Sequence, residues 1–99
     1  MASQVIEIAR QEGTEFRSVR LALEDDGTIK MDAQDIGPTV TRIWGDDDYE
    51  FGVSVPAASL PQLAFELLRE KFLGQLGAVD AFREWCTTHG VQHEFDFWI

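Results

Sequence analysis

Apolar and polar residues alternate along three stretches of the chain, residues 19–24, 29–34 and 49–55. A period of two is typical of a β-strand that buries one face and exposes the other. Residues 25–28 (Asp-Asp-Gly-Thr) separate the first two stretches, and an Asp-Gly pair favours a tight turn because it tolerates positive φ. The pattern therefore predicts a hairpin and, after residue 48, a further strand.

Three other segments have a weaker strand pattern. Residues 39–44 follow Gly37-Pro38, which ends the preceding strand, and we predict a strand there whose inward face the sequence leaves open. The tail, residues 93–99, alternates again and predicts a terminal strand. Residues 4–9 add one more strand if their apolar residues form a buried face. Otherwise residues 1–14 are a loose N-terminal segment.

The apolar period becomes helical after Pro56. Ser59 and Gln62 match a capping box, and a broad apolar stripe follows to residue 72. A second stripe runs from residue 78 to residue 89 and ends before Gly90, which can close a helix. We therefore predict two helices. The breadth of the first stripe indicates that this helix packs against both the sheet and the second helix.

These elements predict an α+β fold in the order β-β-β-β-α-α-β. The sheet is an antiparallel meander of four or five strands, or six with the N-terminal segment, and one of its faces packs against the two helices. Residues 1–99 form a single domain, since about 100 residues is a common domain size. Four apolar residues are expected in one core that joins the sheet to both helices: Phe51, Leu67, Phe82 and Trp85.

Composition narrows the class of protein. With 44% hydrophobic residues the chain has enough apolar material to fold alone. Neither a secretory signal nor an apolar run of about 18 residues is present, so no membrane association is expected. The single cysteine, Cys86, excludes an internal disulfide and fits a reducing compartment. We therefore expect a cytoplasmic, bacterial-type protein.

The net charge of −10 disfavours binding to nucleic acid or to anionic membranes, because both would repel the chain at long range. Most of this charge lies between Glu24 and Glu50, a segment with nine acidic residues and two basic ones, Lys30 and Arg42, and so a net charge of −7. If the first four predicted strands form a simple meander, the turns at residues 25–26 and 46–48 lie at the same end of the sheet. Their charges would then add at one pole.

This acidic pole has three interpretations. Aspartate is common in turns for its local hydrogen bonds, so these residues can be solvated loops. They can instead contact a basic protein partner, whose association the field would accelerate. A calcium site is disfavoured because residues 45–50 lack the spaced ligands of a calcium loop. The candidate partner-binding acids are Asp25, Asp26, Asp46, Asp47, Asp48 and Glu50.

Cys86, His89 and His93 are the one ligand-like cluster, with C-x2-H-x3-H spacing. A structural zinc site needs four ligands, and the fourth would have to come from Glu94 or Asp96 close along the chain. It is simpler that Cys86 is a small buried residue of the helical stripe and that His89 suits the end of a helix. We predict no metal and no cofactor.

Two functions remain. The first is a non-catalytic, acidic protein-binding domain, of the immunity or antitoxin kind or an adaptor, for a basic partner. The aromatic tail adds a second candidate surface, because Trp98 would face outward beside an unpaired strand edge. Such a protein would be a monomer or a weak homodimer. The alternative is a small enzyme or ligand-binding domain whose site the sequence does not display.

Overall fold

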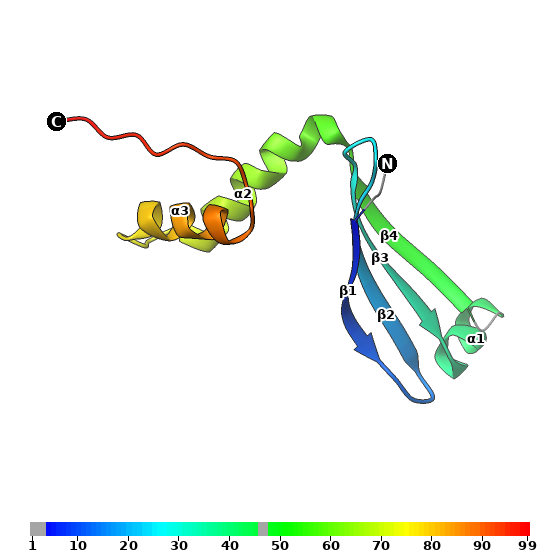
Figure 1. Cartoon of the computed structure of the whole chain (residues 1–99). Helices are drawn as coiled ribbons and strands as arrows, with labels where there is room; N and C mark the ends of the chain where they lie inside the picture. The colour runs from blue at the N-terminus through cyan, green and yellow to red at the C-terminus, as the bar shows by residue number, and fades with distance from the viewer. Residues whose placement is uncertain (1–3, 46–47) are drawn as a thin grey trace. The chain divides into compact units, whose positions relative to one another are not determined.

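A computed structural model describes residues 4–45 and 48–99 (Figure 1). The chain divides into two compact units, a sheet unit that ends at Leu63 and a helical unit that begins at Ala64. It confirms the α+β class and the antiparallel meander sheet. The elements are β1 (Gln4–Gln11), β2 (Phe16–Leu23), β3 (Ile29–Ile36), α1 (Pro38–Trp44), β4 (Asp48–Val55), a 3-10 turn (Ala57–Ser59), α2 (Leu60–Phe72) and α3 (Ala78–Thr88).

The strands follow one another across the sheet in the order β1-β2-β3-β4. The predicted hairpin is confirmed as β2 and β3, which pair from Phe16 with Ile36 to Leu23 with Ile29. Its turn is closed by two backbone hydrogen bonds between Glu24 and residues 27 and 28, and Gly27 takes a φ of 88° that suits glycine. The strand predicted at residues 49–55 is confirmed as β4.

The strand predicted at residues 39–44 is wrong, because this segment is the helix α1. Val40, Ile43 and Trp44 have the i, i+3, i+4 spacing of one helix face, and Val40 is buried. Pro38 stands in the first turn, where its missing amide hydrogen costs nothing. Gly45 closes the helix in the left-handed conformation. The many β-branched residues of the segment favoured the strand interpretation.

The two chain ends also differ from the main prediction. Near the N-terminus the optional strand is present as β1, with a bulge at Ile8 that interrupts its pairing with β2. The strand predicted at residues 93–99 is wrong, since residues 91–99 belong to no strand. Apolar and polar residues alternate in this tail, but the tail is not hydrogen-bonded to any of the four described strands. Instead, the Arg83 guanidinium lies 4.0 Å from the centre of the Phe95 ring.

The pairing register gives the sheet one polar and one apolar face, because residues paired across antiparallel strands point to the same side. The polar face includes Glu7, Arg10, Ser18, Arg20, Lys30, Asp32, Gln34 and Glu50. The apolar face includes Ile6, Val19, Leu21, Met31, Ala33, Phe51, Val53 and Val55. Ser18 and Ala33 are the buried residues of the sheet.

In the second unit, an apolar hollow of about 390 Å³ is lined by residues of α2 and α3. Leu67, Phe82 and Trp85, three of the four predicted core residues, line it, and Cys86 beside them is buried. The ring of Phe82 also packs against that of Phe72, with centroids 5.9 Å apart. Phe51 belongs to the sheet unit, so a single core that includes it, and the packing of the helices on the sheet, stay predictions.

Candidate functional site

Asp25 and Asp26 lie at the opposite end of the sheet from Asp48, so the prediction of a shared pole is wrong. Asp25 and Asp26 follow the end of β2 where Leu23 pairs with Ile29, whereas Asp48 pairs with Ile36 at the far end of β3. The reason is that residues 39–44 form α1 instead of the predicted strand. β4 therefore pairs directly with β3 and begins at the end of the sheet where β3 finishes. Asp46 and Asp47 lie outside the described residues.

Two other acids share the end that carries Asp48. The turn from β1 to β2 contains Glu12 and Glu15, and it lies at this end because Phe16 pairs with Ile36. We call this region the α1 end: helix α1 with Glu12, Glu15, Asp48 and Glu50. Sequence reasoning missed Glu12 and Glu15. Taking residues 4–9 as a certain strand would have placed them there.

Glu15 anchors α1. Its Oε1 accepts hydrogen bonds from the Thr39 backbone N–H at 3.0 Å and from the Thr39 hydroxyl at 2.6 Å. A carboxylate at the start of a helix also suits the helix dipole. Gly37 makes this approach possible, since a Cβ there would stand 2.7 Å from both Glu15 Oε2 and the Thr14 carbonyl oxygen. Glu15 therefore has a structural role.

A row of aromatic rings crosses from α1 onto β4. Trp44 stacks on Tyr49 with centroids 5.0 Å apart, and Tyr49 stacks on Phe51 at 5.3 Å. Trp44 is nevertheless 60% exposed, and its neighbour Ile43 is 62% exposed. The row holds Trp44 in place from one side and leaves its other side open. The α1 end thus combines an ordered, accessible tryptophan with several carboxylates.

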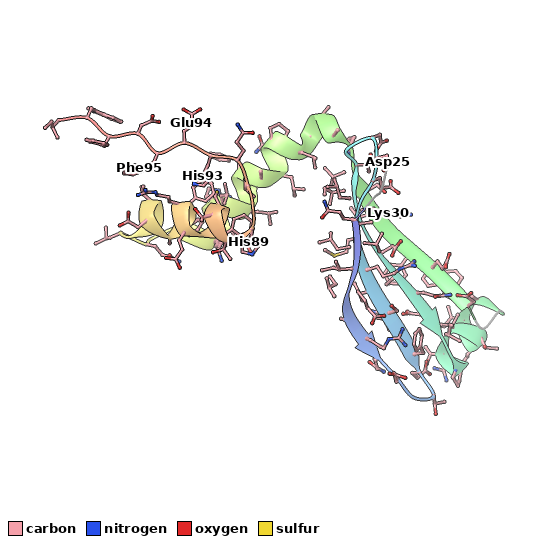
Figure 2. The ribbon with its side chains drawn as sticks, in the orientation of Figure 1. Asp25, Lys30, His89, His93, Glu94 and Phe95 are labelled. Atoms are coloured by element: carbon pink, nitrogen blue, oxygen red, sulfur yellow. The ribbon has the colours of Figure 1, made fainter. Side chains whose placement is uncertain are left out.

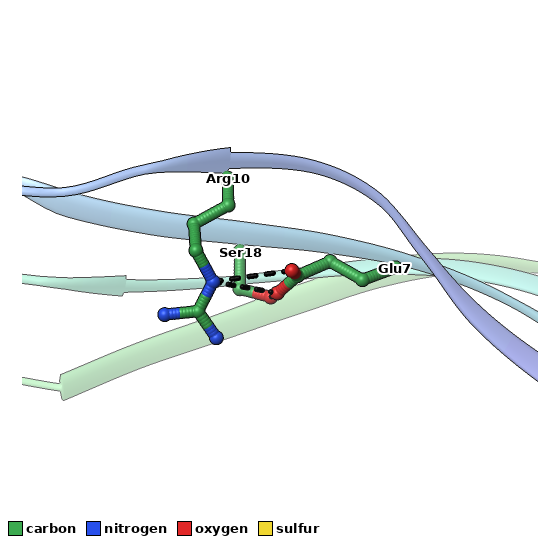
Figure 3. A network of polar contacts seen from close by, with 3 residues as sticks. All are labelled: Glu7, Arg10 and Ser18. Carbon is green, nitrogen blue, oxygen red and sulfur yellow. Dashed lines mark hydrogen bonds and ion pairs between the residues drawn. The ribbon is translucent and has the colours of Figure 1, made fainter.

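Each cation of the sheet is held by an acid of the sheet. Arg10 pairs with Glu7, Arg17 with Asp35, and both Arg20 and Lys30 pair with Asp32: the distances are 3.1, 2.5, 3.1 and 3.8 Å. Figure 3 shows the Glu7 carboxylate between Arg10 and Ser18, whose hydroxyl donates to it at 2.6 Å. Each cation of the sheet is therefore already paired with an acid of a strand, although Arg10 also interacts electrostatically with Glu12 in the neighbouring turn.

These contacts lower the pKa of several carboxyl groups. Hydrogen bonds from Arg17 lower the pKa of Asp35. Those from Arg10, and then from Ser18, lower the pKa of Glu7. At the β2–β3 turn, the backbone N–H of Thr28 donates to Asp26 and lowers its pKa. All three carboxylates are therefore held in the ionised form more strongly than in an unfolded chain.

The acids without a cation gather at the sheet's ends. In the described part of the chain, no ion pair involves Glu24 or Asp25 at the β2–β3 turn, or Glu12, Asp48 or Glu50 at the α1 end. Asp48 accepts a hydrogen bond from the Gln34 side-chain amide at 3.1 Å. Figure 2 shows Asp25 at the turn and Lys30 further along the sheet. Both ends are therefore negative.

On the C-terminal tail Trp98 is 85% exposed, and Phe97 is 76% exposed as well. The strand edge that was expected beside Trp98 is absent, because the tail is not a strand. Stacking with Phe95 at 6.2 Å is the ring contact of Phe97. Trp98 is thus an exposed residue on an irregular segment of the helical unit.

The cysteine and histidines predicted not to bind metal are each engaged in local contacts. Cys86 is buried. The His89 ring stacks on Trp85 at 4.0 Å, and its Nδ1 lies 2.8 Å from the Trp85 carbonyl oxygen. His93 Nδ1 lies 2.8 Å from the Val91 carbonyl oxygen. Among residues 4–45 and 48–99, no group of three or more His, Cys, Asp or Glu is placed to hold a metal ion.

Comparison with known proteins gives no relative: no family model, curated protein or solved structure matches the chain. Within the residues that the structure describes, no helix has the length and apolar character needed to cross a bilayer. The geometry of the α1 end is therefore the main guide to function.

Proposed function

We propose that this chain is a small, non-catalytic, acidic protein-binding domain, of the immunity, antitoxin or adaptor kind, and that the α1 end of its sheet binds a basic partner protein. One observation carries the proposal. An ordered but exposed Trp44 lies at the same end of the sheet as Glu12, Asp48 and Glu50, three carboxylates that form no ion pair in the described part of the chain.

The chemistry of the α1 end resembles that of a protein interface. Aromatic residues are enriched where interfaces concentrate their binding energy, and a polar rim surrounds them. Trp44 and Ile43 supply the apolar centre, and Glu12, Asp48 and Glu50 supply the rim. The stack on Tyr49 already restricts the Trp44 side chain, so less side-chain entropy is lost when a partner binds. The complementary surface is an apolar pocket bordered by lysine or arginine.

Charge supports a basic partner over other classes. The net charge of −10 repels nucleic acid phosphate and attracts cationic proteins, which it brings to the acidic ends at an increased rate. The free, buried thiol of Cys86 fits a reducing cytoplasm, where we place the protein. We expect it to act as a monomer or weak homodimer.

The test is affinity capture from cells of the source organism at low and high salt, followed by kinetics with the partner that is identified. Trp44→Ala should shorten the lifetime of the complex by about tenfold or more, because a central aromatic residue is lost. Glu12→Gln, Asp48→Asn and Glu50→Gln made together should slow association at low salt and flatten its salt dependence.

Trp98→Ala is the matched control, since it removes an exposed tryptophan from the other unit. It should leave both rates unchanged. If Trp98→Ala abolishes binding while Trp44→Ala does not, the aromatic tail is the binding surface and the α1 end is a solvated rim.

A further inference from the structure

The two edges of the sheet differ in how well they could pair with another strand. β1 carries a bulge at Ile8, where its register against β2 shifts, and a bulge disturbs the regular spacing that a new strand would need. β4 pairs with β3 over all eight residues without a shift. Figure 1 shows β4 along one edge of the sheet. In the described part of the chain no strand is hydrogen-bonded to its outer side.

The side chains of β4 define the chemistry of a strand that would fit there. On the apolar face, Phe51 is 41% exposed and Val53 is 68% exposed. Glu50 and Asp48 stand on the opposite face with no ion pair among the described residues. A complementary strand would therefore alternate between apolar residues and lysine or arginine.

Gly52 of this edge strand lines a hollow on each face of the sheet. A Cβ at Gly52 would stand 2.8 Å from Asp32 Cβ, so this position accepts glycine alone without a shift of β3. On the polar face Gly52, Glu50 and Ser54 line a hollow of about 360 Å³ that extends over the Asp32 ion pairs with Arg20 and Lys30. On the apolar face Gly52 lines another, of about 310 Å³, with Phe51 and Val53.

We propose that the open edge of β4 takes an extended segment of the basic partner as a fifth strand, by main-chain hydrogen bonds, and selects a segment that alternates apolar residues with lysine or arginine. Strand addition to an open edge is an established mode of peptide recognition, in which backbone bonds give affinity and alternate side chains give specificity. This inference rests on the proposed function and specifies the form in which the partner binds.

The probe is a synthetic peptide, acetyl-Lys-Val-Lys-Val-Lys-Val-Lys-amide, with binding followed by fluorescence anisotropy and by backbone amide hydrogen exchange. Exchange should slow at residues 48–55 and stay unchanged at residues 4–11. Two control peptides have the same composition or charge: a block isomer with four lysines followed by three valines, and the alternating peptide with every second backbone amide methylated. Each should bind about tenfold more weakly or worse, because the first lacks the alternation and the second loses several hydrogen bonds.

Val53→Lys is the protein variant, because residue 53 is exposed enough to accept the change without loss of the fold. A lysine on the edge strand repels the basic peptide and should weaken binding about tenfold. Val53→Thr is the matched control, since it keeps a β-branched residue without charge, and its affinity should stay close to wild type. Circular dichroism shows whether each variant is folded.

Two outcomes would overturn the inference. In one, the peptide binds while exchange at residues 48–55 is unchanged. In the other, exchange there slows with protein concentration alone as the molecular mass doubles, which makes a second copy of the chain the occupant. The proposed function fails separately, if Trp44→Ala leaves partner capture intact. If the peptide protects β4 and Trp44→Ala still captures the partner, the α1 end is not the binding surface, while strand addition to β4 stands.

Discussion

The sheet unit is held together by residues far apart in the sequence, whereas the helical unit is held mainly by residues close together. Glu15 binds Thr39, Arg17 binds Asp35, and each strand depends on its neighbour. From Ala64 onward the buried residue is Cys86, and the contact between the Phe72 and Phe82 rings joins α2 to α3 over ten residues. Substitutions where two segments contact each other closely should therefore lower the stability of the sheet unit most. In the helical unit, the loss of apolar side-chain volume should lower stability most.

The largest effect is expected for Gly37→Ala in the sheet unit. The change combines a φ of 148° with a Cβ placed 2.7 Å from Glu15 and from the Thr14 backbone. It should lower the free energy of unfolding by about 3 kcal/mol, measured by urea denaturation. Gly13→Ala is the control, because Gly13 has a φ of 121° but no atom within 4 Å of the added Cβ. It should cost about 1 kcal/mol, from backbone strain alone.

If both glycine variants lower the free energy of unfolding equally, the close packing around Glu15 contributes nothing to stability. The contrast between the two units would then lose its basis.

Phe82→Ala should have the next largest effect, in the helical unit. The Phe82 side chain contacts Phe72 and lines the apolar hollow, but it is 39% exposed. We expect a loss of about 2 kcal/mol, below the range for a fully buried phenylalanine. Amide exchange resolved by residue is the measurement. Faster exchange confined to α2 and α3 would sharpen the contrast between the units, while faster exchange in β2 and β3 as well would show that they unfold together.

Acid should weaken the sheet unit through Asp35. Its pKa in the folded chain lies below the ordinary value of 3.8, because Arg17 donates hydrogen bonds to the carboxylate. A lowered pKa contributes stability above the unfolded pKa, and this contribution disappears as the pH falls through the folded pKa. Unfolding free energies measured from pH 6 down to about pH 2 should therefore fall less steeply in Asp35→Asn. Arg17→Gln should flatten the same slope, and the double variant should add nothing further.

A slope in Asp35→Asn as steep as in the wild type would show that the Arg17 pair does not contribute to acid stability.

The smallest effect is expected for metal removal in the helical unit. The described part of the chain has no group of three or more His, Cys, Asp or Glu placed to hold a metal ion, and Cys86 is buried. Protein purified without added metal should contain well under one equivalent of zinc, and a chelator should leave the melting temperature unchanged. A stoichiometric zinc signal that Cys86→Ser and His89→Ala together abolish would contradict this.

The sequence predicted the elements whose patterns are local and regular. The β2–β3 hairpin, β4 and both long helices follow directly from periodicity and turn residues. The spacing of Val40, Ile43 and Trp44 also carried a helical signal, but seven residues rich in β-branched side chains read equally well as a strand. In β1 the bulge at Ile8 breaks the alternation that would have identified the strand.

The candidate site was predicted less well, because it depends on topology. Because residues 39–44 were predicted as a strand and form a helix, Asp48 lies at the opposite end of the sheet from Asp25 instead of beside it. Glu12 and Glu15 were overlooked for the same reason, since their place follows from β1. Charge density in the sequence thus identified the acidic segments but could not say which of them are neighbours in space.

The neutralised sheet with two negative ends has a consequence for how a cationic molecule would approach. Seven charged residues in the middle, three acids and four bases, nearly cancel: Glu7, Asp32, Asp35, Arg10, Arg17, Arg20 and Lys30. Like charge at two opposite ends is a quadrupolar arrangement, whose dipole moment along the strands is small. Its field attracts a cation to either end with little preference. Since that field is screened within about 8 Å at physiological salt, short-range contacts such as those of Trp44 must decide which encounters last.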